Sequence, residues 1–462
     1  MGVTAFNPRP YQELIRDHIV DNARCAVFAD LGMGKTAGTL SAIELLWLLG
    51  SNYWPALIIA PLRVARGTWP REVASWRDFA HLKVSAITGT EPERLTALKR
   101  RADIYTINFE NLIWLADVLG DKWPFQIVVV DESTRLAGFR LRKGTKRAKV
   151  LASVAKKTGR FIELTGTPAI GGLEKLWGQL WFLDYGQRLG RTYGEFKSRW
   201  FDEDVYAHTL TAKHFALDQI SESISDICLT VRAKDYFDIK EPLRFKIEID
   251  LPPKAEALYT QLEKEMYAEL DARTHVDVLT AAHLSSKCLQ LASGALIAKE
   301  TDTYKKAVTE IHEAKLDALE SLVEECSGAP LLVGYWWQHD QARILKRFPQ
   351  ARAIVTQQDE DDWNAGKIPL APAHYASLGH GLNLQHGGHR FVHFSRWWDA
   401  ELDEQLRGRI GPVRQLQSGY ERPVYEYEII ARGTVDELVS YRHVSRREVH
   451  DILADRTRRR AA

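Results

Sequence analysis

The sequence predicts an α/β protein with two parallel-sheet lobes and helical insertions between them. Short apolar strands alternate with helical segments in the first part of the chain and again in the last part. A glycine-rich loop ending in Gly-Lys-Thr follows the first strand, and polar motifs follow later ones. These motifs fall at the carboxyl ends of strands, where parallel sheets bind their ligands.

The composition is that of a globular chain with room for two or three domains. The chain has 462 residues, of which 45% are hydrophobic and 27% charged, and a formal net charge of +1. This balance excludes a uniformly basic coat, so nucleic-acid contacts have to come from local patches. The four cysteines form no Cys-x-x-Cys pair, which favours reduced thiols in a cytoplasm. No apolar run is long enough to span a bilayer, and we expect no membrane partner.

The expected first lobe covers residues 1–185. Its continuous apolar strands indicate a parallel sheet covered by helices on both faces. The helix predicted over Ala37–Leu49 ends before Gly50, as a C-cap glycine would end it. The predicted strands are Ala26–Phe28, Leu57–Ala60, Val84–Ile87, Ile104–Ile107, Ile127–Val130 and Phe161–Leu164.

A candidate phosphate-binding loop covers Ala29–Thr36. Gly32 and Gly34 let its backbone N–H groups cradle phosphate oxygens, and the Lys35 ammonium can reach the outer phosphates. The Thr36 hydroxyl can ligate Mg²⁺. The first position of the loop is alanine where the usual pattern has glycine, a change of one methyl group.

Gln12 precedes this loop and is a candidate reader of adenine. Its amide can pair with both a donor and an acceptor edge of the base. The alternative is a solvated glutamine at the start of a helix.

Two carboxylates, Asp131 and Glu132, end the predicted strand Ile127–Val130. Such a pair is costly at the end of an apolar strand unless a cation lies beside it. We expect Asp131 to hold Mg²⁺ through water, and Glu132 to orient and deprotonate the attacking water. The alternative is a strand that simply ends in a polar turn. Thr165 and Thr167 end the next strand, and their hydroxyls can report the state of the γ-phosphate.

The order of these motifs resembles superfamily 2 helicases and, more narrowly, the Swi/Snf-type DNA translocases. Pro10-Tyr11-Gln12 is similar to the opening motif of that family, and Ala60-Pro61-Leu62 with Trp69 to its second motif. The resemblance covers nearly the whole chain. It implies two RecA-like lobes that hydrolyse ATP with Mg²⁺. The chain departs from the family at Ser133-Thr134, where the family has Ala-His.

Residues 133–162 contain ten basic residues and no acidic one. Such a stretch suits a phosphate backbone, and the alternative is a solvated helix face. The candidate nucleic-acid contacts are Arg135, Arg140, Arg142, Lys143 and Lys146, with Arg63 and Asn108 as weaker candidates at strand ends.

The alternation of strands and helices stops between residues 186 and 310, where we expect helical insertions and a linker. This range contains helical stretches at Tyr193–Phe201 and Leu258–Leu270 and one β-like run at Arg244–Leu251. Alternation resumes over 311–462, the expected second lobe. Its predicted strands are Pro330–Val333, Ile354–Val355, Pro369–Ala373, Phe391–Phe394 and Tyr425–Ile430.

Two segments of the second lobe resemble family motifs. Ser377–Leu384 resembles the fifth motif, and it contributes Gly381 and Asn383 as candidate coupling residues. Its glycines allow close approach of the backbone to DNA or ribose.

The stretch Gln405–Gln415 resembles the last motif of the family. By this resemblance Gln405 joins the candidate catalytic residues, and Arg409 matches an arginine that contacts the γ-phosphate. The family's second arginine falls at Pro412, and Arg414 is the alternative. The arginine finger therefore stays open between Arg409 and Arg414.

The sequence thus predicts an ATP-hydrolysing motor that moves along or remodels double-stranded DNA. One alternative is a strand-separating helicase on DNA or RNA. Another is an ATP-controlled binding switch without efficient hydrolysis, suggested by the departures at Ser133-Thr134 and Pro412. We expect double-stranded DNA as partner, with single-stranded DNA as an alternative, and a protein partner of unknown kind. We also expect a monomer in the cytoplasm of a bacterial or phage-infected cell.

Overall fold

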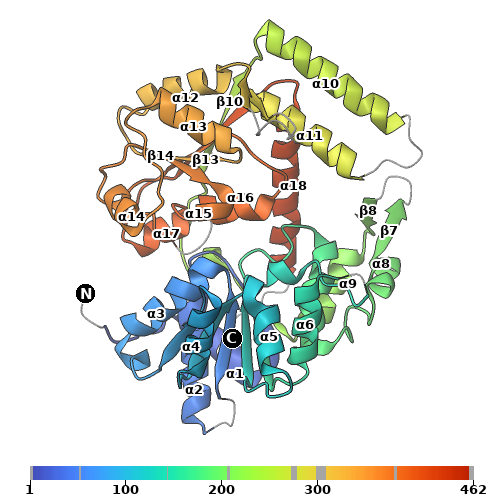
Figure 1. The fold of residues 1–462 in the computed structure, drawn as a ribbon, viewed down its shortest axis with the longest axis vertical. Coiled ribbons are helices and arrows are strands. Elements are labelled where there is room, and N and C mark those ends of the chain that lie inside the picture. The colour runs from blue at the N-terminus through green and yellow to red at the C-terminus, as the bar shows by residue number, and fades with distance from the viewer. Residues whose placement is uncertain are drawn as a thin grey trace. The chain divides into compact units, whose positions relative to one another are not determined.

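The computed structural model describes the chain except residues 1–3, 51–53, 143, 205–208, 272–277, 298–307, 379–381 and 457–462. The chain divides into two compact units (Figure 1), Met1–Asp238 with Arg446–Ala462, and Ile239–Ser445. Each unit is built on one parallel sheet covered by helices, which confirms the predicted α/β class with two RecA-like lobes. None of the helices in the described residues has the length and apolar character needed to cross a membrane.

The sheet of the first unit has seven parallel strands in the order β3-β4-β2-β5-β6-β1-β9. All of the strands predicted for the first lobe are present. Their central members are buried along their whole length because helices cover both faces. The strands are β1 (Arg24–Ala29), β2 (Ala56–Ala60), β3 (Val84–Ile87), β4 (Ile104–Asn108), β5 (Ile127–Asp131), β6 (Arg160–Thr165) and β9 (Cys228–Val231).

The helices of this unit connect successive strands or follow them. The predicted helix after the glycine-rich loop is present, and Gly50 beyond its end has a φ of 68°. The helices are α1 (Pro10–Asp21), α2 (Lys35–Leu48), α3 (Trp69–Ser75), α4 (Glu91–Lys99), α5 (Leu112–Leu119), α6 (Lys146–Ala155), α7 (Leu176–Asp184), α8 (Tyr193–Trp200) and α9 (Ala216–Ile224). A small hairpin, β7 (Phe201–Asp204) with β8 (Thr209–Ala212), follows α8.

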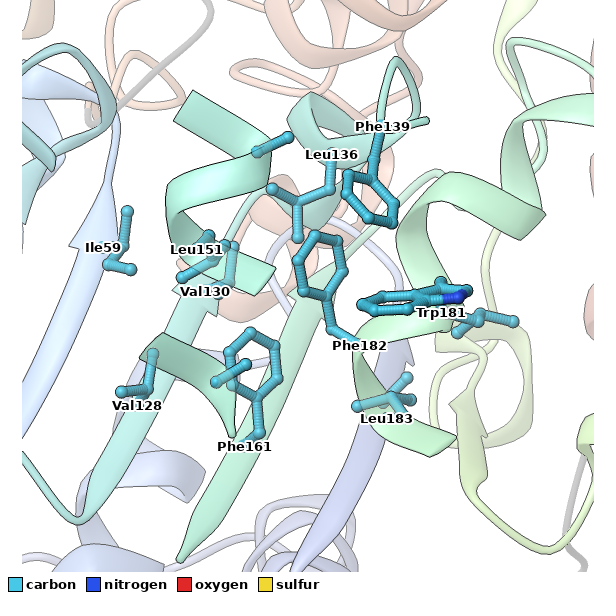
Figure 2. Close-up of a cluster of buried hydrophobic side chains, with 14 of the residues drawn as sticks. Ile59, Val128, Val130, Leu136, Phe139, Leu151, Phe161, Trp181, Phe182 and Leu183 are labelled. Atoms are coloured by element: carbon cyan, nitrogen blue, oxygen red, sulfur yellow. The ribbon is translucent and has the colours of Figure 1, made fainter. Parts of the chain in front are cut away.

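One face of this sheet forms a large aromatic core (Figure 2). The ring of Phe182 on α7 stacks on Phe161 of β6 with centroids 5.8 Å apart, and Phe139 lies 4.8 Å from the same ring. Leu151 of α6 contributes to the same cluster. This packing fixes β6, and with it the polar turn that follows the strand.

The boundaries between the parts of the chain differ from the expected 1–185, 186–310 and 311–462. The range expected to hold helical insertions and a linker supplies an edge strand to each sheet: β9 pairs with β1, and β10 (Leu243–Ile249), which matches the β-like run predicted at Arg244–Leu251, pairs with β16. The first unit accordingly extends to Asp238. The short edge strand β9 obtains its conformation from tertiary pairing, so its local sequence signal is weak. Helical insertions are nevertheless present as α10 (Pro253–Asp271) and α11 (Val278–Ser293).

The sheet of the second unit has five parallel strands in the order β10-β16-β15-β13-β14. The prediction of a strand at Ile354–Val355 is wrong. These two residues form no strand, and the only pairing near them is an isolated bridge between Ala351 and Leu370. The strands after β10 are β13 (Leu331–Tyr335), β14 (Leu370–His374), β15 (Arg390–His393) and β16 (Tyr425–Ala431), and a hairpin joins β11 (Ala295–Ile297) to β12 (Val308–Glu310). The helices are α12 (Ala314–Glu325), α13 (Gln338–Arg347), α14 (Gln357–Asn364), α15 (Tyr375–Leu378), α16 (Ala400–Arg407), α17 (Pro412–Gln417) and α18 (Val435–Arg456).

Candidate functional site

The candidate phosphate loop joins β1 to α2. Gly32 and Gly34 have φ values of 89° and 61°, a region that glycine enters at little cost. The turn that they make lets α2 begin at Lys35. Lys35 Nζ lies 2.6 Å from the carbonyl oxygen of Ala29 and 3.5 Å from that of Asp30. The ammonium is therefore held over the loop itself, where phosphate oxygens would be stronger partners.

Gln12 reaches the same loop from α1. A Cβ atom added to Gly34 would clash with Gln12 Nε2, so glycine alone leaves room for this amide. The other end of the amide is fixed as well, because Gln12 Oε1 accepts a hydrogen bond from the Arg9 N–H at 2.9 Å. The structure thus brings the candidate adenine reader and the phosphate loop together.

The loop is also tied to the strand at the edge of the sheet. Asp30 Oδ2 accepts a hydrogen bond of 2.8 Å from the N–H of Ala233, just beyond β9. The ring of Tyr11 packs edge-on against Tyr236 at 5.1 Å in the same segment. Sequence reasoning missed this segment because its partners lie some two hundred positions earlier in the chain.

Neighbouring strand ends bring the other candidates of the first unit to this loop. β6 lies between β5 and β1, and its register pairs Leu164 with Asp131 and Thr165 with Phe28. A Cβ atom on Gly166 would lie 3.3 Å from the carbonyl oxygen of Ala29 and 3.5 Å from Lys35 Nζ. The acidic pair, the Thr-Gly-Thr-Pro turn and the phosphate loop therefore meet at one edge of the sheet.

Asp131 is buried and held by an indole. Its Oδ2 accepts a hydrogen bond from Trp69 Nε1 at 3.0 Å. Burial raises the pKa of Asp131, while the Trp69 hydrogen bond and the charge of Lys35 oppose this rise. Trp69 was matched to a family motif, but its role was missed because its partner belongs to another strand.

The donor set at this edge fits Mg²⁺. The Thr36 hydroxyl and the Asp131 carboxylate are hard oxygen ligands of the kind that Mg²⁺ prefers. A divalent cation would also compensate the buried charge of the ionised Asp131.

Glu132 has a different environment from Asp131. Its backbone is left-handed, with φ 62° and ψ 59°, which costs a non-glycine residue about 1 kcal/mol or more. The side chain is partly exposed, whereas Asp131 is buried. The two adjacent carboxylates thus have different environments, a difference that allows them different chemical roles.

The turn after β6 is rigid. Thr165 Oγ1 accepts a hydrogen bond of 3.1 Å from the Thr167 N–H, and Gln179 of α7 donates to the carbonyl oxygen of Pro168 at 2.9 Å. Thr167 Oγ1 is buried and finds no hydrogen-bond partner within the described part of the chain. This hydroxyl is available to a ligand or to a bound water.

Two of the candidate nucleic-acid residues are committed to the fold. Arg140 donates to the carbonyl oxygens of Ala137 and Phe139, and its guanidinium carbon lies 3.4 Å from the ring centre of Tyr193. Asn108 is buried and donates to Glu110 Oε2 at 2.8 Å. Both are better explained as structural residues than as DNA contacts.

The other candidates in the described residues are exposed, namely Arg63, Arg135, Arg142 and Lys146. Lys143 lies outside the described residues. The basic surface has a counter-charge that the local sequence does not show: Glu110 lies 3.6 Å from Arg135 and 3.2 Å from Arg147. Burial opposes ionisation of Glu110, but its hydrogen bond from Asn108 and these two arginines keep its pKa below the usual value.

In the second unit, Asn383 is the centre of a hydrogen-bond cluster. Its N–H donates to Glu360 Oε1 at 2.9 Å, and its carbonyl oxygen accepts from Asn364 Nδ2 at 2.7 Å. Its side-chain oxygen accepts from Arg414 Nη1 at 2.6 Å. The candidate coupling segment and one candidate arginine are therefore in direct contact. Gly381, the other candidate of this segment, lies outside the described residues.

The two candidate arginines are held differently. Arg409 is buried, and its Nη1 lies 3.4 Å from the carbonyl oxygen of Leu382. Arg414 is partly exposed and is oriented by the Asn383 side chain. Burial lowers the pKa of Arg414 to about 10, and Glu360 opposes this shift. Gln405 is buried and donates to Glu401 Oε1 at 3.2 Å, within its own helix α16.

The chain is similar to known proteins and to solved structures. The family model of the SNF2-related domain matches residues 14–325. The putative protein p41 of Acyrthosiphon pisum secondary endosymbiont phage 1 is 47% identical, over 98% of this chain and 99% of that protein. Among solved structures, the Sulfolobus solfataricus SWI2/SNF2 ATPase core in complex with dsDNA matches with a TM-score of 0.45 and 20% identity, over 98% of this chain and 94% of that one.

More distant relatives are longer proteins. The DNA annealing helicase and endonuclease ZRANB3 of Mus musculus is 24% identical over 90% of this chain but only 38% of its own length. The putative ATP-dependent helicase/translocase YwqA of Bacillus subtilis is 23% identical over 91% of this chain and 45% of its own length. The range matched by the family model contains the phosphate loop, the acidic pair and the Thr-Gly-Thr-Pro turn. The chain therefore belongs to the SNF2-related family, whose domain is a helicase-like ATPase core.

Proposed function

We propose that the protein is an ATP-driven motor that moves along or remodels double-stranded DNA without separating its strands. The observation that carries the proposal is the meeting of three motifs at the carboxyl edge of one sheet. Lys35, Asp131 and Gly166 belong to those motifs, and the ends of adjacent strands hold them there. Hydrolysis of a nucleotide requires groups that bind its phosphates, hold a metal ion and activate water, all at one place.

The residues of the first unit divide the work of hydrolysis. Gln12 binds adenine, and Lys35 with the loop N–H groups binds the phosphates. Thr36 and Asp131 would hold Mg²⁺, which neutralises charge on the phosphate oxygens. Glu132 accepts a proton from the attacking water.

The resemblance to the family implies an arginine that neutralises charge in the transition state, and both candidates lie in the second unit. We assign the arginine finger to Arg414, since a side-chain hydrogen bond to Asn383 can be exchanged for a phosphate contact at little cost. Arg409 is buried beneath the backbone of Leu382, so we assign it to the support of the coupling segment.

The DNA contact is proposed for the exposed basic surface at the start of α6. Arg135, Arg142 and Lys146 belong to it, and exposed cations of this kind bind the phosphate backbone. The relative ZRANB3 is named a DNA annealing helicase, which supports DNA as the polymer. The phage origin of the 47% identical relative supports a role in a phage-infected bacterial cell.

Steady-state ATPase measurements with and without duplex DNA test the proposal. We expect DNA to stimulate hydrolysis, and both Lys35→Ala and Glu132→Gln to lower kcat by at least ~10³. Glu222→Gln, which neutralises an exposed carboxylate of α9, is the matched control and keeps full activity. Hydrolysis that neither variant reduces would overturn the motor.

Displacement assays then separate translocation from unwinding. A motor of the proposed kind strips a third strand from a DNA triplex and leaves a plain duplex intact. Efficient unwinding of the plain duplex would show that the protein is a strand-separating helicase instead.

A further inference from the structure

The strand β10 forms one edge of the sheet in the second unit (Figure 1). It pairs with β16 along seven residues, and within the described residues no strand pairs with its other edge. Leu243 and Phe245 on this strand are each 46% exposed. A long edge with exposed apolar side chains is a template for another strand, and proteins normally protect such edges.

The backbone of β10 shows which residues can accept a further strand. The Leu243 N–H donates to the carbonyl oxygen of Val424, and the carbonyl oxygen of Ile249 accepts from the Arg432 N–H. The odd-numbered residues thus direct their backbone groups toward β16. Because this direction alternates along a strand, the even-numbered residues direct their N–H and C=O groups outward.

The side chains along this strand follow a pattern that is symmetric about its centre: apolar positions mirror apolar positions, and basic positions mirror acidic ones. Residues 243–251 read Leu-Arg-Phe-Lys-Ile-Glu-Ile-Asp-Leu, with Ile247 at the centre. Apolar residues occupy every odd position. The even positions carry two bases before the centre and two acids at the mirrored places after it.

We propose that two copies of this chain pair antiparallel through the outer edges of β10, about a two-fold axis at Ile247. In this register Lys246 faces Glu248 of the second copy, and Arg244 faces Asp250 of the second copy. Each facing pair has opposite charges. Because the axis is two-fold, each pair occurs twice in the dimer. The even-numbered residues that face each other are also those whose backbone groups point outward, so this register satisfies both the ladder and the charges.

The neighbouring register is disfavoured. An axis at Lys246 would place two ammonium groups directly opposite each other, which destabilises a strand pair. The ends of the charge pattern already have partners in the same chain, since Arg244 contacts Glu426 at 3.1 Å and Arg432 contacts Asp250 at 2.8 Å. Among the ion pairs within the described residues, none involves Lys246, and Glu248 has only a 4.0 Å contact with Arg432. The pair of Lys246 with Glu248 therefore fixes the register.

A charge-swap experiment tests the proposal on the full chain. Lys246→Glu places a second carboxylate against Glu248 of the second copy, and Glu248→Lys places two ammonium groups opposite each other. Each single variant should dissociate with a Kd raised about tenfold or more, measured by analytical ultracentrifugation. An equimolar mixture of the two variants should recover the dimer, because each facing pair then carries opposite charges.

The recovery in the mixture cannot come from a folding defect, because two damaged proteins would not repair each other. Wild-type protein that stays monomeric up to high micromolar concentration would overturn the proposal. So would single variants that dimerise as the wild type does, or a mixture that stays monomeric.

Cysteine cross-linking tests the register itself. In the proposed pairing Ile247 meets Ile247 of the second copy at a non-hydrogen-bonded position, with Cα atoms roughly 4.5 Å apart, a separation that a disulfide can bridge. Ile247→Cys should give a covalent dimer on mild oxidation. Phe245→Cys is the control, since it leaves the charges intact and its two copies would lie four positions apart along the strands, roughly 13 Å, too far to cross-link. Cross-linking of the control and not of Ile247→Cys would overturn the register.

Discussion

The candidate site residues of the two units are held in place by different means. In the first unit, backbone conformation and tight packing position the polar groups: Gly34 leaves room for Gln12, and strand register aligns Asp131 with the turn after β6. In the second unit, side-chain hydrogen bonds converge on Asn383. A site fixed by backbone tolerates almost no substitution. A site fixed by exchangeable side-chain bonds can change partners during a reaction cycle.

The largest effect is expected at the backbone-fixed half, for Gly34→Ala. The new methyl group clashes with Gln12 Nε2, and φ at this position is 61°. We expect ATP binding to weaken by about 100-fold or more, measured by titration with a fluorescent nucleotide. Gly50→Ala is the matched control, because Gly50 has a φ of 68° and no atom of the described residues lies within 4 Å of the added atom. It should lose about 1 kcal/mol of stability and keep its affinity for ATP. Equal loss of binding in both variants would contradict the explanation.

The next effect distinguishes the two arginines of the second unit. Arg414→Ala should lower kcat by roughly 10³ and leave the unfolding free energy nearly unchanged. Asn383→Ala should lower kcat less, and the double variant should be no worse than Arg414→Ala, because the two residues act as one unit. Arg409→Ala should instead destabilise the fold by about 2–4 kcal/mol, measured by urea unfolding, since it removes a buried charged donor. A large loss of kcat in a fully stable Arg409→Ala protein would make Arg409 the finger.

A smaller effect is expected for Trp69→Phe, which removes the hydrogen bond to Asp131 but keeps an aromatic ring. The pKa of Asp131, already raised by burial, should rise further. A raised pKa means that Mg²⁺ must displace a proton, so the requirement for Mg²⁺ should increase about tenfold, and most at the acidic end of the pH range. ATPase rates as a function of Mg²⁺ at several pH values measure this. An unchanged Mg²⁺ dependence at low pH would show that the indole has no role in metal binding.

The smallest effect is expected for Glu110→Gln on the basic surface. Removing this counter-charge frees Arg135 and Arg147, so the affinity for duplex DNA should increase about two- to fivefold at low salt. The salt dependence of binding should become steeper. Glu222→Gln again serves as the control, being exposed but outside the basic stretch. Weaker binding in Glu110→Gln would show that Glu110 orients the arginines for DNA.

The sequence predicted the strands and motifs of both lobes, because buried parallel strands and glycine loops leave strong local patterns. The structure confirmed the fold class and placed Gln12, Lys35 and Asp131 together. Contacts that depend on tertiary packing could not be predicted: the hydrogen bond from Trp69 to Asp131 and the contact of Glu110 with Arg135 each join residues that lie far apart in the sequence.

The range 186–310, expected to hold helical insertions and a linker, also supplies the edge strands β9 and β10. The β-like run at Arg244–Leu251 indicated β10, whereas the four-residue strand β9 left no clear local pattern. The proposed dimer likewise departs from the expected monomer, since the mirrored chemistry of residues 243–251 becomes informative only when β10 is known to lie at an edge.

The hydrogen bond between Asp30 and the Ala233 N–H has a mechanical consequence. Asp30 belongs to the candidate phosphate loop, and Ala233 lies shortly before Asp238, where the first unit ends. Because the hydrogen bond joins the two residues, we expect a displacement of the loop to move Ala233 with it.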